Sequence, residues 1–152
     1  MSAGEWDDLM GELQDFMELL ATAQRAIAPP AGAKDIALAT DEPPPQIATF
    51  PCFVNMEREV RPSSIMGNPS LRHFVHIVEM HLLFAPADRK YAVRERRPWL
   101  EPIFDALDKD DALTGAYGCE ILGANYDNWE YPPDSGVQYI AINFQLAVSA
   151  EK

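Results

Sequence analysis

The sequence predicts an α+β fold in which helices pack on one face of a four-stranded, mostly antiparallel sheet. Three observations lead to this prediction. A long N-terminal stretch repeats apolar residues at helical spacing, four later stretches have strand character, and a second helical stretch divides those strands into two pairs. The predicted element order is therefore αββαββ, within a single domain over residues 1–152.

The first predicted helix covers residues 4–27 and is amphipathic. Ser2 and Glu5 have the spacing of a capping box, and Pro29 ends the pattern. Residues 28–46 are rich in alanine and proline and predict a long surface connection, which lets the helix pack on its own sheet or on a neighbouring copy. The apolar positions of the helix recur three and four residues apart: Trp6, Leu9, Met10, Leu13, Phe16, Met17, Leu20 and Ile27.

The first pair of strands is predicted on either side of a long loop. Residues 47–55 read as a strand interrupted by Pro51, which has no amide proton to donate and so favours an edge or a bulge. Residues 71–84 alternate as a strand. The loop between them, residues 56–70, is longer than most hairpin connections, and long loops are often functional.

The second helix and the second pair of strands follow. Helical character begins at Asp88, but Pro98 places either the start of the regular helix or a kink near Trp99. Residues 117–126 and 136–150 predict the last two strands. The final strand alternates most regularly, with one face made of Ile140, Ile142, Phe144, Leu146 and Val148 and the other of Ala141, Asn143, Gln145 and Ala147.

Composition restricts the possible functions. The chain has 24 acidic and 12 basic residues, a net charge of -12, which argues against binding nucleic acid or anionic membranes. Cys52 and Cys119 fit no metal or redox spacing and are expected to be free, mostly buried thiols. The N-terminal stretch is acidic, and no segment approaches the roughly 20 apolar residues of a membrane span. We expect a protein made in the cytoplasm with no membrane partner.

The three histidines fall in one predicted strand, RHFVHIVEMHLL. Alternation places His73, Glu79 and His81 on one face and His76 on the other. His73 and His81 would lie roughly 26 Å apart, too far to share one metal ion. Glu79 and His81 are neighbours that could share a ligand or a hydrogen bond, although a partly solvated strand face is the ordinary explanation for such a pair. We predict no catalytic, metal or cofactor site.

Several segments together carry a resemblance to a known family. They are PPPQIATFPCFVN, HFVHIVEMHLLF, RRPWLEPIFDAL, YGCEILG and GVQYIAINFQLAVSAEK, and in the last a glycine and an aromatic residue lead into an alternating strand. In layout and strand character, without a diagnostic motif, the chain resembles the tail terminator and tail completion proteins of long-tailed bacteriophages.

The resemblance implies a virion structural protein without catalytic residues. Its copies, typically six, would form a homo-oligomeric ring at the head-proximal end of the tail tube, between the tail tube protein and a head-completion or neck protein. DNA would pass through without specific binding. A neck or head-completion adaptor and a minor tail protein are alternatives within this class. A small ligand-binding or enzymatic α+β domain that uses Glu79 and His81 is the alternative of another class.

The predicted loop at residues 56–70 is our candidate contact between copies. Arg58 and Arg61 supply charge, and Ile65 and Met66 supply apolar surface that a partner would cover. The other possibility is that Ile65 and Met66 fold back onto their own core. Because negative walls repel phosphate, we also expect the inner rim of the ring to be acidic.

Overall fold

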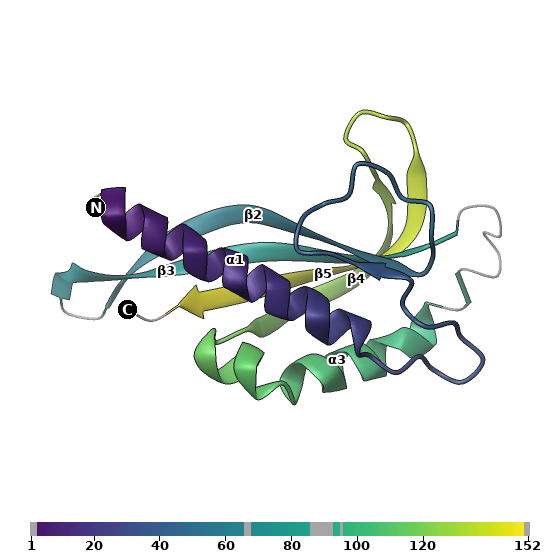
Figure 1. The fold of residues 1–152 in the computed structure, drawn as a ribbon, viewed down its shortest axis with the longest axis horizontal. Coiled ribbons are helices and arrows are strands. Elements are labelled where there is room, and N and C mark those ends of the chain that lie inside the picture. Colours follow the sequence, from purple (N-terminus) through teal and green to yellow (C-terminus); the bar gives the residue numbers. More distant parts are fainter. Residues whose placement is uncertain (1–2, 66–67, 86–92, 95, 151–152) are drawn as a thin grey trace.

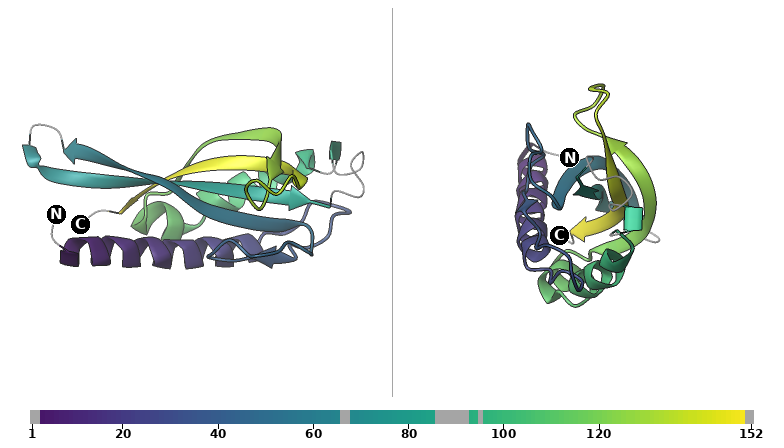
Figure 2. Two further views of the ribbon diagram at one scale, coloured as in Figure 1. Left: turned by 90° about the horizontal axis from the view of Figure 1, so that it is seen from above. Right: turned by 90° about the vertical axis from the view of Figure 1, so that its right-hand side faces the viewer.

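A computed structural model describes residues 3–65, 68–85, 93–94 and 96–150. It confirms the α+β class, with helices on one face of a sheet (Figures 1 and 2). The prediction of four strands is wrong, because the sheet has five strands in the order β1-β2-β3-β5-β4. The elements are α1 (Ala3–Arg25), β1 (Leu38–Ala39), β2 (Cys52–Ile65), β3 (Asn68–Phe84), α3 (Leu100–Asp108), β4 (Glu120–Glu130) and β5 (Gln138–Ala150).

The additional strand, β1, lies inside the alanine- and proline-rich connection. Leu38 pairs with Cys52 and Ala39 with Phe53 in parallel, whereas every other pair of strands is antiparallel, so the sheet is mixed. Two residues are too few to produce a detectable alternation, which is why the sequence did not reveal β1. The pairing attaches part of the connection to the edge of its own sheet.

The prediction of a loop over residues 56–70 is also wrong. β2 continues to Ile65 and β3 begins at Asn68, so the segment consists mostly of two antiparallel strands. We call residues 57–65 and 68–75 the β2–β3 ribbon. Its outer part, residues 63–65 and 68–73, extends past the ends of β4 and β5, because β3 pairs with β5 only from Phe74 onward (Figure 2). Pro62 fits here because, in the described part of the chain, this stretch of β2 pairs only with β3 and needs no donor on its outer side. The predicted start at residue 47 is corrected to Cys52.

α1 confirms the predicted first helix and packs on its own sheet. Its side chains Leu13, Phe16 and Leu20 are buried in the same core cluster as Phe53 of β2. The predicted capping residue Ser2 lies outside the described residues. Within the described part of the chain, no helix is long and apolar enough to cross a membrane.

A buried pair of amides joins α1 to β2. Gln24 Nε2 donates to Asn55 Oδ1 (2.7 Å), and Asn55 Nδ2 donates back to Gln24 Oε1 (2.8 Å). Asn55 Nδ2 also donates to the main-chain oxygen of Thr40 (3.1 Å). Both side chains are fully buried, so these bonds satisfy groups that water cannot reach. The pair fixes the position of the helix along the strand.

The second helical region follows the predicted proline pattern. A 3₁₀ turn at Arg97–Trp99 leads into the regular helix α3, and the predicted start at Asp88 lies outside the described residues. The last strand, β5, confirms its predicted alternation, because the five apolar residues of its inner face are buried in the core beneath the helices. The penultimate strand, β4, covers residues 120–130 instead of the predicted 117–126.

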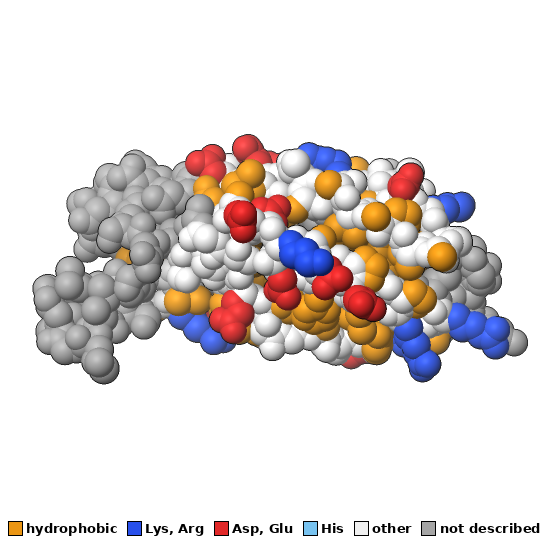
Figure 3. Space-filling model, turned by 90° about the horizontal axis from the view of Figure 1, so that it is seen from below, with side chains coloured by type: hydrophobic (Ala, Val, Ile, Leu, Met, Phe, Trp, Pro, Cys, Tyr) orange, Lys and Arg blue, Asp and Glu red, His pale blue; other side chains and the backbone are white. Residues whose placement is uncertain are grey.

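One side of the molecule mixes charged and apolar side chains (Figure 3). Seen from below, acidic side chains are scattered among apolar ones, and several lysines and arginines gather toward the end of the molecule where the chain enters α3 (Figure 3). The face of the sheet away from the helices carries an apolar cluster at one end. Farther along, it carries polar side chains such as Asn143 and Gln145 together with apolar ones such as Ile77. We call it the open face.

Candidate functional site

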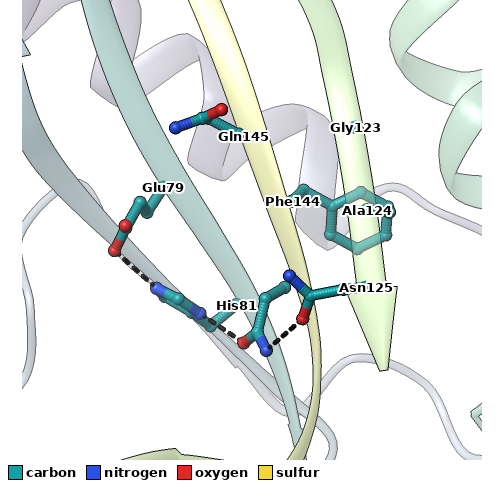
Figure 4. A pocket seen from close by; sticks show the side chains of 8 residues that line it. Glu79, His81, Gly123, Ala124, Asn125, Phe144 and Gln145 are labelled. Carbon is teal, nitrogen blue, oxygen red and sulfur yellow. Dashed lines mark hydrogen bonds and ion pairs between the residues drawn. The ribbon is translucent and has the colours of Figure 1, made fainter. Parts of the chain in front are cut away.

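The polar residues of the open face come from three adjacent strands. His81 of β3 is opposite Asn143 of β5, and Asn143 is opposite Asn125 of β4. Glu79 and Gln145 form the next cross-strand pair along β3 and β5. Directly opposite residues point to the same side of a sheet, so these five side chains meet on one face (Figure 4).

A chain of polar contacts connects these side chains to β2. Arg58 of β2 donates to Glu79 Oε1, and His81 Nε2 lies 3.2 Å from Glu79 Oε2. On its other side, His81 Nδ1 lies 2.6 Å from Asn143 Oδ1, and Asn143 Nδ2 donates to Asn125 Oδ1 (2.9 Å). The network therefore crosses all four long strands. Strands hold such groups more rigidly than loops do.

An aromatic stack covers one side of this network. The rings of His81 and Trp129 are stacked with centroids 3.9 Å apart, and Trp129 stacks in turn on Tyr131 at 5.1 Å. The hydroxyl of Tyr131 donates to the main-chain oxygen of Pro44. His81 is thereby removed from solvent, with only 4% of its surface exposed.

The neighbours of His81 determine which nitrogen carries its proton. Asn143 Nδ2 also lies 3.3 Å from the main-chain oxygen of Asp127, which can only accept, so the amide oxygen of Asn143 must face the ring. His81 Nδ1 therefore donates to Asn143. Burial lowers the pKa of His81 below its usual value of 6.5 and outweighs the opposing effects of Asn143 and Glu79. The ring is neutral near pH 7, and only its protonated form also donates to Glu79.

This low pKa gives a testable pH dependence. As the pH falls below about 6.5, we expect the free energy of unfolding to decrease, because the unfolded chain takes up a proton at His81 before the folded protein does. One such group contributes at most about 1.4 kcal/mol per pH unit. Urea unfolding of the wild type and of His81→Gln across this range isolates the contribution as a difference. Equal pH slopes in the two proteins would contradict it.

A hollow of about 330 Å³ lies beside the network. Gly123 helps to form it, since a side chain at this position would project into open space. The lining offers carboxylate, amide and imidazole groups, which can hold a small polar group by hydrogen bonds. The lining residues are Glu79, His81, Gly123, Ala124, Asn125, Asn143, Phe144 and Gln145 (Figure 4).

The described residues offer little for metal or nucleophilic chemistry. Over the ranges that the structure describes, no three histidine, cysteine, aspartate or glutamate side chains gather in a way that could hold a metal ion. Cys52 and Cys119 are free, as expected, and burial raises the pKa of each to about 12. Both therefore remain protonated thiols at neutral pH, whereas a nucleophile must be a thiolate.

The structure brings together some of the predicted residues and separates others. Glu79 and His81 are in direct contact, as their spacing allowed. Arg58 and Arg61 lie on the β2–β3 ribbon, where Arg61 donates to Glu59 (2.6 Å) and this hydrogen bond lowers the pKa of Glu59. The side chains of Ile65, Met66 and His73 are not among those that the structure describes.

Sequence reasoning did not identify Asn125 and Asn143 as partners of His81. The sequence of each strand alone does not indicate this contact, because the contact depends on how β3, β5 and β4 align.

Comparison with models of known protein families finds no match, and no curated protein matches the chain.

Proposed function

We propose that the protein is a non-enzymatic structural component of a bacteriophage virion, a tail terminator. Its copies, about six, form a ring at the head-proximal end of the tail tube. The ring stops tube growth and joins the tail to the head. The proposal rests on the resemblance in layout and on one observation, the β2–β3 ribbon, whose outer part extends past the ends of β4 and β5 (Figure 2) and whose inner part carries the exposed Arg58 and Arg61.

The ribbon suits a contact between copies. A closed ring requires two different surfaces on each subunit that meet head to tail. A paired two-stranded ribbon keeps its shape better than a loop would, so less conformational entropy is lost on binding. The side chains of Arg58 and Arg61 are 58% and 60% exposed and are available to a neighbour.

The charge distribution supports passage of DNA without binding. The chain has a net charge of -12, with 24 acidic and 12 basic residues. Phosphate binding depends on free basic groups, which release counterions from DNA. We therefore propose an acidic inner rim, with the tail tube protein on one side of the ring and a head-completion or neck protein on the other. A neck adaptor or a minor tail protein would use the same surfaces.

Virions that lack the protein test this role. In a phage that carries this gene, its deletion is expected to give tails of uncontrolled length or heads and tails that fail to join, as seen by electron microscopy. Restoring the gene in trans is the control. Normal, complete particles in the deletion mutant would contradict the proposal.

The hollow on the open face favours a second candidate, a small domain that binds a polar ligand through Glu79 and His81. The two candidate functions predict different behaviour of the purified protein in solution. A protein that stays monomeric and melts at a higher temperature with a small polar ligand would favour the second, because a ligand that binds only the folded state stabilises it.

A further inference from the structure

Both outer edges of the sheet are largely free. Among the described residues, β4 pairs only with β5, and β2 beyond Phe53 pairs only with β3. Most residues of β4 are exposed. The strand contains neither lysine nor proline, which commonly protect an edge from pairing with another chain.

The strand directions allow these two edges to meet. β2, β3, β5 and β4 alternate in direction, because each neighbouring pair is antiparallel. A second copy placed with its β2 beside β4 would therefore continue the alternation. Its open face would then lie on the same side as that of the first copy, and the contact would be head to tail.

The charges on the two edges are complementary. On the open face, the β2 edge presents Arg58 and Arg61. The β4 edge presents Glu120, opposite Ala147, and Asp127, opposite Ala141, and both carboxylates are exposed. Arg58 and Arg61 are three residues apart on β2, whereas the β5 partners of Glu120 and Asp127 are six residues apart, so a single register cannot bring both carboxylates to the arginines. Glu120 of one copy would thus approach the two arginines of the next. Such complementarity selects partner and orientation.

Apolar surface lies along the same edge. Leu122 and Tyr126 of β4 are 48% and 41% exposed, the largest exposed apolar side chains of that strand. Leu122 sits at the irregularity between Ile121 and Gly123, where β4 departs from regular pairing with β5. A neighbouring strand would cover part of both side chains and supply burial that an isolated copy lacks.

We propose that β4 receives the β2 edge of a second copy of this chain, in an antiparallel pairing that extends the sheet from one subunit to the next. Arg58 and Arg61 of one copy lie beside Glu120 of the other. The inference rests on the proposed ring and specifies the contact that builds it.

A charge exchange tests the pairing. The variants Arg58→Glu/Arg61→Glu and Glu120→Arg each place like charges at the contact, so each should raise the concentration at which rings form by about tenfold or more. The triple variant combines both changes, restores opposite charges and should recover assembly. Because Arg58 also contacts Glu79, melting curves of the monomers confirm folding, and Arg61→Glu alone serves as a milder variant.

Hydrogen exchange provides a readout that needs no substitution. The outward amides of β4 should exchange more slowly in assembled wild-type protein than in the dilute monomer. Rings that form equally well in the Arg58→Glu/Arg61→Glu and Glu120→Arg variants, or rings whose β4 amides exchange as in the monomer, would overturn this contact while leaving the tail terminator role intact. A wild-type protein that never assembles would instead remove the proposed function itself.

Discussion

Replacing Phe144 with alanine is expected to lower the free energy of unfolding by about 3–5 kcal/mol. Phe144 lies in the middle of β5 with 1% of its surface exposed, and its ring meets that of Phe104 edge-on at 6.1 Å. Strands pair with β5 on both sides, so the backbone cannot easily move inward to fill the cavity. Denaturant unfolding monitored by circular dichroism measures the loss.

The matched control is the next residue of the same strand. Gln145 points to the open face and is exposed, so Gln145→Ala should change the free energy of unfolding by no more than about 0.5 kcal/mol. The contrast between these neighbours tests which face of β5 is the core. Similar losses in both variants would contradict the assignment.

Replacing Asn55 with leucine should cost about 1–3 kcal/mol. The substitution removes both hydrogen bonds that the Gln24 side chain makes with Asn55. The amide of Gln24 then lies fully buried without either bond. The double variant Gln24→Leu/Asn55→Leu should lose less than the sum of the two single variants, since replacing both polar partners leaves only the Thr40 oxygen short of a donor.

Thermal and urea unfolding of the three variants give this coupling directly. Gln14→Ala is a suitable control, because its bond to Asp41 (2.6 Å) joins the same helix to the connection outside the buried core, so a smaller loss is expected. Losses from the two single variants that add without coupling would show that the amide pair does not act as a unit.

The helices and strands that could be predicted are those whose apolar residues recur at a regular spacing. α1 and β5 each place one apolar face against a common core, and therefore both carry a regular pattern. The β2–β3 ribbon has no such requirement. Residues such as Glu57, Glu59 and Arg61 are exposed, so their stretch of strand reads as a polar loop.

Of the candidate site, only the contact between two residues of the same strand, β3, could be predicted from the sequence. Alternation placed Glu79 and His81 on the same face, and they are in contact. Asn143 and Asn125 come from strands 62 and 44 residues away from His81 in the sequence, and their contact depends on strand order and register. A shift of one residue in β5 would have placed Asn143 on the core side instead.

We propose that the protein acts by assembling with copies of itself through its exposed sheet edges. Mass measurement of the purified protein over a wide concentration range can test this assembly. We expect a concentration-dependent transition from monomer to one closed species of about six copies. A protein that remains monomeric at every concentration would contradict it.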